Sequence, residues 1–256
     1  MHTGSVKNNN KIVVITGATG SGKSDLAISV ARSLFERKGQ GCEIIAADSR
    51  TVYKGMDIGT AKPSMDERGG VPHWGFDLVR PDEHFSVKDF CEYAKKKTEE
   101  IQRRGNQVLI VGGTGLYIDA LAYGYQFNDD VKKTCSDRAE FAGPYKIFAL
   151  DWDRTELRKR LKKRINKMFN DERLEKETIG LVNKYGWESK AMTADVYRYV
   201  WAVHQGEMSK DEAMEKCEID DWHLAKRQLT WFKRTSEIEW VKYDEAKERI
   251  LACLGC

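Results

Sequence analysis

The sequence predicts an α/β fold in which helices flank a parallel sheet, with a helical C-terminal region. Between residues 11 and 150, short runs of β-branched residues alternate with segments of helical apolar spacing. This alternation is typical of parallel strands that are joined by helices. From Arg154 to about Phe232 no segment has the pattern of a strand, and a short apolar run returns only near the end of the chain.

The first predicted strand is Lys11 to Thr16, an apolar β-branched run that is followed by glycine. A helix over Ser24 to Lys38 follows, because its apolar residues recur at helical spacing until Gly39. The remaining elements continue the alternation. They are a strand over Glu43 to Ala47, a helix over Val87 to Arg104, and strands over Val108 to Val111, Lys146 to Leu150 and Ile238 to Val241.

Length and composition narrow the class of protein. The 256 residues are 41% hydrophobic, which is enough for a core, and no apolar run approaches the ~20 residues of a membrane span. The polar first ten residues have no apolar h-region, so no secretory signal is predicted. Six scattered cysteines favour reduced thiols in a cytoplasm. A net charge of +3 excludes a histone-like polycation but allows a local basic surface.

A glycine-rich segment separates the first strand from the first helix. It fits the pattern G-x-x-x-x-G-K-[ST], whose backbone N–H groups turn toward phosphate oxygens at a helix N-terminus. Lys23 supplies a positive charge, and the Ser24 hydroxyl can hold Mg²⁺. The segment therefore predicts a P-loop NTPase-like sheet that binds a di- or triphosphate. The binding residues expected are Gly17, Ala18, Thr19, Gly20, Ser21, Gly22, Lys23 and Ser24.

An acid at the end of a later strand usually completes an NTP-hydrolysing site. The strand over Val108 to Val111 ends instead in Gly112-Gly113-Thr114, and the clearest acid at a strand end is Asp48. Ligand sites of open α/β sheets form at the carboxyl ends of the strands, so we expect Lys23, Asp48 and Thr114 to converge. The alternatives are a turn or N-cap role for Asp48 and an N-cap role for Thr114.

Further motifs follow in a characteristic order. Asp48-Ser49 precedes Gly59-Thr60-Ala61-Lys62-Pro63, then Val71-Pro72-His73, Gly112 to Tyr117 and finally Lys226 to Phe232. Over most of the chain, this order resembles the tRNA dimethylallyltransferase family. The resemblance implies transfer of a dimethylallyl group from its diphosphate to N6 of the adenine beside the anticodon, position 37 of tRNA. It also implies that the P-loop holds a prenyl diphosphate rather than ATP.

The residues suit that chemistry. The departing diphosphate must be neutralised, by Lys23, the loop amides and Mg²⁺ as the expected cofactor. The amine must lose a proton, which suits a carboxylate such as Asp48. By resemblance, Thr114 lies at the bridging oxygen of the diphosphate and Arg138 lies close to the leaving group. The expected catalytic residues are Asp48, Thr114, Arg138 and Lys23.

RNA binding requires a basic surface. A helix from Arg154 to Lys167 carries basic residues on several faces, among them Lys159, Arg160 and Arg164. The alternative interpretation of this helix is a solvated amphipathic face. The tRNA contacts expected are Asp48, Ser49, Arg50, Thr51, Thr114, Arg138, Arg198, Lys226, Arg227 and Gln228.

The chain departs from the family pattern in three places. Thr51 stands where the family usually has Gln, and a threonine cannot make a bidentate amide contact with adenine. Val196 replaces a family glycine. Arg138 is followed almost directly by the strand at Lys146, where many bacterial relatives have a long helical insertion. The chain is therefore expected to be a compact form.

The expected organisation is a disordered tail (1–10), a P-loop α/β core (11–152), a helical tRNA-binding region (153–236) and a strand and helix that return to the core (237–256). The expected partners are the anticodon stem-loop of tRNA and dimethylallyl diphosphate, with no membrane, and the protein is expected to be a cytoplasmic monomer. The alternatives are a prenyltransferase acting on free adenine nucleotides, a small-molecule P-loop kinase, and a non-catalytic RNA-binding protein that kept the fold.

Overall fold

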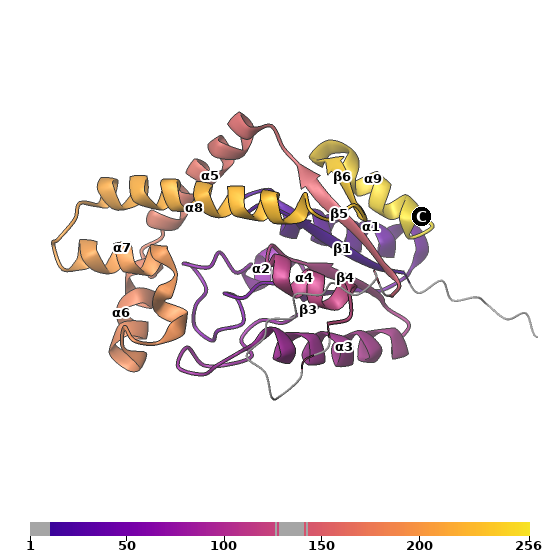
Figure 1. Ribbon diagram of the computed structural model, residues 1–256, viewed down its shortest axis with the longest axis horizontal. Coiled ribbons are helices and arrows are strands. Elements are labelled where there is room, and N and C mark those ends of the chain that lie inside the picture. The colour runs from indigo at the N-terminus through magenta and orange to yellow at the C-terminus, as the bar shows by residue number, and fades with distance from the viewer. Residues whose placement is uncertain (1–10, 126, 128–140, 142) are drawn as a thin grey trace, which may run out of the picture.

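The computed structural model describes residues 11–125, 127, 141 and 143–256, and the expected tail at residues 1–10 lies outside them. Six parallel strands form one sheet in this part of the chain, in the order β3-β2-β4-β1-β5-β6 (Figure 1). The predicted α/β fold is thereby confirmed. The strands are β1 (Ile12–Gly17), β2 (Cys42–Ala46), β3 (His73–Trp74), β4 (Gln107–Val111), β5 (Tyr145–Asp151) and β6 (Ile238–Lys242).

Strand β3 was not predicted, because two residues are too few to show a period-two pattern. It pairs with β2 at the edge of the sheet, where His73 lies opposite Ile44. The indole N–H of Trp74 donates a 2.6 Å hydrogen bond to the buried carboxylate of Glu43, which fixes this edge strand to its neighbour.

Helices cover both faces of the sheet (Figure 1). α1 (Lys23–Lys38) and α9 (Tyr243–Cys253) pack on one face, and α3 (Val87–Arg103) with α4 (Gly115–Ala122) packs on the other. The inner strands β1 and β4 are therefore buried on both sides, which explains the continuous apolar run of β1.

The C-terminal half of the chain adds the helices α5 to α8 and then returns to the sheet. α8 packs against α5 and α7, and its end reaches α4 and β1, where Phe232 is buried in the core (Figure 1). β6 then pairs with β5. Within the described residues, no helix combines the length and apolar character needed to cross a bilayer. The helices are α5 (Arg154–Phe169), α6 (Arg173–Tyr185), α7 (Asp195–His204) and α8 (Lys210–Phe232), with the short helix α2 (Met65–Arg68) earlier in the chain.

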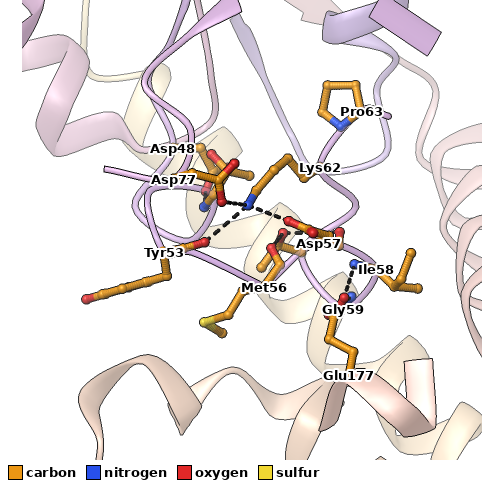
Figure 2. A network of polar contacts seen from close by, with 12 residues as sticks. Asp48, Tyr53, Met56, Asp57, Ile58, Gly59, Lys62, Pro63, Asp77 and Glu177 are labelled. Carbon is orange, nitrogen blue, oxygen red and sulfur yellow. Dashed lines mark hydrogen bonds and ion pairs between the residues drawn. The ribbon is translucent and has the colours of Figure 1, made fainter. Parts of the chain in front are cut away.

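Glu177 of α6 connects the helical region to the loop after β2 (Figure 2). Its carboxylate accepts hydrogen bonds from the backbone N–H groups of Ile58, at 2.8 Å, and Gly59, at 3.0 Å. The hydroxyl of Tyr197 donates a third, at 2.7 Å. Burial, with Glu177 nearby, raises the pKa of Tyr197, so the phenol keeps the proton that it donates. A Cβ on Gly59 would lie only 2.5 Å from the Tyr197 ring, so this contact requires glycine.

Lys62 stabilises the same loop through hydrogen bonds and ion pairs of its side chain (Figure 2). Its buried ammonium group donates to Asp57 at 2.6 Å, to Asp77 at 2.7 Å and to the backbone carbonyl of Tyr53 at 3.1 Å. A buried ammonium group needs such partners, because an unpaired one would be costly. The motif around Gly59 and Lys62 therefore holds the loop and the helical region together.

Candidate active site

The P-loop lies between the end of β1 and the start of α1. Gly17, Gly20 and Gly22 have φ values of +139°, +73° and +86°, a region that L side chains rarely adopt. A Cβ on Gly20 would also lie 2.7 Å from Leu161 of α5. The glycines therefore serve both the turn of the loop and its close packing under α5.

Lys23 curls back over this loop. Its ammonium group donates hydrogen bonds to the carbonyl oxygens of Gly17, at 3.1 Å, and Ala18, at 2.7 Å. Burial lowers the pKa of Lys23 to about 8, with Asp48 opposing the shift and Arg164 adding to it. The side chains of Asp48 and Arg164 are therefore close enough to Lys23 to change its pKa.

The ends of β2 and β4 are joined by a side chain. The hydroxyl of Thr114, just after β4, accepts a 3.0 Å hydrogen bond from the backbone N–H of Ser49, just after β2. Thr114 occupies the N-cap position of α4, but its side chain makes no capping hydrogen bond. Because β4 lies between β2 and β1, this contact forms beside the P-loop. The predicted convergence of Lys23, Asp48 and Thr114 thus has a structural basis.

Asp48 forms a turn of its own. Its Oδ1 accepts hydrogen bonds from the backbone N–H groups of Arg50, at 2.8 Å, and Thr51, at 3.4 Å. This is the turn role that the sequence left open as an alternative. In the part of the chain that the structure describes, both of these hydrogen bonds end on Oδ1, and Oδ2 makes none.

The glycines of the segment after β4 permit three close approaches. A Cβ on Gly112 would lie 2.0 Å from the carbonyl oxygen of Ala47, next to Asp48. A Cβ on Gly113 would lie 2.5 Å from the side chain of Gln228, and one on Gly115 would lie 2.4 Å from Trp231. The segment is therefore in close contact with the loop after β2 and with α8.

Gln228 of α8 lies between two loops of the site. Its Oε1 accepts a 2.7 Å hydrogen bond from the backbone N–H of Thr19 in the P-loop, and its Nε2 donates a 2.9 Å bond to the carbonyl of Gly113. One turn further on, the indole N–H of Trp231 donates to Asp119 of α4 at 3.0 Å. The C-terminal motif Lys226 to Phe232 thus packs α8 onto the site.

Two arginines of α5 also hold the P-loop. Arg160 Nε donates to the carbonyl of Gly20 at 2.8 Å, and Arg164 donates to the hydroxyl of Thr19 at 2.8 Å and to Asp221 at 2.7 Å. Burial raises the pKa of Asp221, and Arg164 opposes that shift.

Sequence reasoning placed these arginines in an RNA-facing basic helix, and it missed Trp152, whose indole N–H donates to Ser21 O at 3.0 Å. A signal was present in the sequence. Arg160 and Arg164 are four residues apart and so lie on one face of the helix, next to the buried residues Leu161 and Ile165.

The other predicted tRNA contacts differ in their exposure to solvent. Thr51 is only 5% exposed, and its hydroxyl has no hydrogen-bond partner within the described residues. Arg198 on α7 and Lys226 and Arg227 on α8 are exposed. Arg138 lies outside the described residues.

The residues around Ser24 fit a magnesium ion that is held mainly by substrate. Ser24 is exposed on the first turn of α1. Among the described residues, no three His, Cys, Asp or Glu side chains gather into a metal-binding group. Mg²⁺ usually keeps several waters and binds through one or two protein ligands and phosphate oxygens, which this arrangement allows.

A P-loop on a parallel sheet, with a carboxylate and a hydroxyl from neighbouring strand ends, defines a protein that acts on a phosphorylated substrate. The family model described as IPP transferase matches residues 51–143 and 130–235. The tRNA dimethylallyltransferase 1 of Citrifermentans bemidjiense is 33% identical, with 94% of this chain and 95% of that protein aligned. The tRNA dimethylallyltransferase of Geobacter metallireducens is 34% identical over 94% and 96%. The chain belongs to the IPP transferase family.

Solved structures agree with this assignment. The tRNA isopentenylpyrophosphate transferase of Bacillus halodurans is 26% identical, with a TM-score of 0.80 over 96% of each chain. The tRNA delta(2)-isopentenylpyrophosphate transferase of Staphylococcus epidermidis is 29% identical, with a TM-score of 0.79 over 95% of this chain and 98% of that one.

The alignments also bear on chain length. The alignment with the C. bemidjiense protein spans 296 positions, more than the 256 residues of this chain, so that relative has residues that this chain lacks. The family model matches in two segments, which meet and overlap at residues 130–143. This position adjoins the connection from Arg138 to Lys146, where the sequence predicts a missing insertion.

Proposed function

We propose that the protein transfers a dimethylallyl group from dimethylallyl diphosphate to N6 of the adenine at position 37 of tRNA, giving N6-dimethylallyladenosine. Membership of the IPP transferase family and relatives named tRNA dimethylallyltransferase support this activity. The structural observation that carries it is the hydrogen bond between Ser49 and Thr114, which brings Asp48 beside the P-loop.

The reaction forms a bond between N6 and C1 of the dimethylallyl group and breaks the bond between C1 and the diphosphate oxygen. The N6 proton passes to Asp48, whose Oδ2 is the available oxygen. Lys23 and the loop amides stabilise the charge that develops on the diphosphate. Mg²⁺, held at Ser24, would neutralise further charge on the diphosphate. Thr114 and Arg138 act at the leaving group.

The exposed basic residues provide the tRNA surface. Lys162 and Lys163 lie on the solvent side of α5, and Arg198, Lys226 and Arg227 are exposed on α7 and α8. We propose a cytoplasmic location, because the enzyme acts on tRNA and because the described cysteines are free thiols.

The kinase alternative lacks support at β4, which ends in Gly112 and Gly113 rather than in an acid. The decisive experiment incubates the protein and a Lys23→Ala variant with unmodified tRNA and dimethylallyl diphosphate, followed by nucleoside mass spectrometry. Parallel reactions contain AMP in place of tRNA, or ATP as the donor. We expect N6-dimethylallyladenosine in tRNA with the wild type alone. Product with AMP but not with tRNA, or ATP turnover without prenylation, would refute the proposal.

A further inference from the structure

We propose that Gln228 is a positioning residue that sets the distance between the diphosphate-binding loop and Thr114. The proposal rests on the function proposed above, for which these two loops carry the donor and the leaving-group contact. The sequence predicted Gln228 as a tRNA contact, and the structure gives its amide other partners. We call the pair of hydrogen bonds from Thr19 N to Gln228 Oε1 and from Gln228 Nε2 to Gly113 O the Gln228 bridge.

The bridge uses both ends of one side-chain amide. At 2.7 Å and 2.9 Å both bonds have ordinary lengths, and each one joins Gln228 to a backbone group. A Gln side chain offers one acceptor oxygen and two donor hydrogens in a rigid plane. The separation of the Thr19 N–H from the Gly113 carbonyl is therefore fixed by the size of one amide group.

Each bond lies close to a group that the reaction needs. Thr19 is in the P-loop, where its hydroxyl is also held by Arg164. Gly113 directly precedes Thr114, whose hydroxyl contacts Ser49 beside Asp48. A shift of the Gly113 carbonyl would therefore move Thr114 relative to the diphosphate. Misplacement by about 1 Å can cost ~10²-fold in rate, even when no reacting group is altered.

Gly113 supplies an independent observation for the bridge. A Cβ there would lie 2.5 Å from Gln228 Nε2, so any side chain at position 113 would displace the amide of Gln228. Gly113 has no positive φ value, so its backbone conformation does not require glycine. The close contact with Gln228 is what favours glycine at position 113. The bridge can therefore be broken by a substitution at either Gln228 or Gly113.

The test therefore uses Gln228→Met, Gly113→Ala and the double variant. Methionine keeps the length of Gln228 but has no amide, and alanine at 113 displaces the amide. His223→Gln, an exposed change on the same helix, is the matched control. For each protein we would measure kcat and KM for dimethylallyl diphosphate at saturating tRNA, the Kd of inorganic pyrophosphate, the Kd of tRNA, and Tm.

We expect each single variant to lower kcat/KM for dimethylallyl diphosphate by about 10- to 100-fold, the scale of one or two lost hydrogen bonds. Most of the loss should be in kcat, with a weaker Kd for inorganic pyrophosphate as well, because the P-loop loses its support at Thr19. The tRNA Kd should change little, and the Tm should fall by no more than a few degrees. Because both changes break one bridge, the double variant should be no worse than the poorer single variant.

Three results would overturn the proposal. Loss of tRNA affinity with an unchanged rate at saturating tRNA would make Gln228 an RNA contact. Wild-type kinetics in Gln228→Met would show that the bridge has no role. Multiplicative losses in the double variant would show that the two residues act separately. If the wild type itself does not prenylate tRNA, the proposed function fails. The pyrophosphate Kd then decides the bridge alone, since unchanged binding in both single variants would refute it.

Discussion

The hydroxyl of Thr114 accepts a 3.0 Å hydrogen bond from the backbone N–H of Ser49, although the two residues lie 65 positions apart in the chain. The contact joins the ends of β2 and β4 and leaves the side chain of Asp48 beside the P-loop. Thr114, which we assign to the leaving group, is therefore bonded directly to the loop that carries Asp48, the proposed base.

Thr114→Val tests this link. Valine keeps the shape of threonine but cannot accept the bond from Ser49, so the loop that carries Asp48 loses its fixed position. We expect kcat to fall by about 10- to 100-fold, with less loss in Thr114→Ser, which keeps the hydroxyl. Steady-state kinetics of tRNA prenylation check this. Wild-type kcat in Thr114→Val together with a loss in Thr114→Ser would show that the methyl group, rather than the hydroxyl, is what matters.

Asp48→Asn tests the base. The amide is nearly isosteric and can still accept turn bonds through its oxygen, but it cannot take the amine proton. We expect the single-turnover rate to fall by ~10²–10⁴-fold, with both substrates still bound. Single-turnover kinetics and binding assays separate the two effects. A loss confined to tRNA affinity would make Asp48 a recognition residue.

Lys23 predicts a pH dependence. Burial lowers its pKa from 10.5 to about 8, so the neutral form grows above pH 8 in the unliganded protein. Pyrophosphate binds the charged form, so its affinity should fall by about tenfold per pH unit above pH 8. Calorimetric titrations between pH 7 and pH 9.5 check this, and the weak residual binding of Lys23→Ala should show no such fall.

The lowered pKa of Lys23 also makes the stability of the fold depend on pH. Stability should rise with pH, whereas pyrophosphate affinity should fall. Between pH 8 and pH 10.5 the unfolded chain binds more protons at Lys23 than the folded chain does. The contribution of Lys23 to the free energy of unfolding should therefore rise with pH across that window. Denaturant unfolding of wild type and Lys23→Ala gives this contribution as a difference, which should grow in favour of the wild type as the pH rises.

The exposed lysines of α5 predict a salt dependence. Lys162 and Lys163 face solvent, whereas Lys159 pairs with Glu156 at 2.7 Å. Neutralising Lys162 and Lys163 to Gln should reduce the slope of log tRNA affinity against log salt by ~1.4–1.8 units. The matched control is neutralisation of Lys95 and Lys96 on α3, which are also exposed. Equal slopes in wild type and in the α5 variant would assign α5 to a solvated face.

Glu177 predicts a stability effect away from the chemistry. Glu177→Ala leaves two backbone N–H groups and the Tyr197 hydroxyl without their acceptor. We expect a loss of about 2–4 kcal/mol in the free energy of unfolding. Glu175→Ala is the control, since Glu175 forms an exposed pair with His204 that should contribute less than about 1 kcal/mol. Similar losses in both variants would contradict the anchoring role.

The sequence by itself determined the α/β class, the P-loop and the long elements, because these depend on short-range patterns. The run of β1, the glycines around Lys23 and the acid at Asp48 are each legible within a few residues. Motif order along the chain determined the family resemblance. None of these signals requires knowledge of which strand lies next to which.

Only the tertiary structure decided what the long-range contacts do. The sheet order places β4 between β1 and β2, so the Thr114 hydroxyl meets Ser49 instead of capping α4. Packing of α5 and α8 against the P-loop turns Arg160, Arg164 and Gln228 inward, although their residue types predicted an RNA-facing surface. Residue type states what a side chain can bond. Its actual partner lies 65 to 209 residues away in these contacts, and a local sequence pattern does not indicate such distant segments.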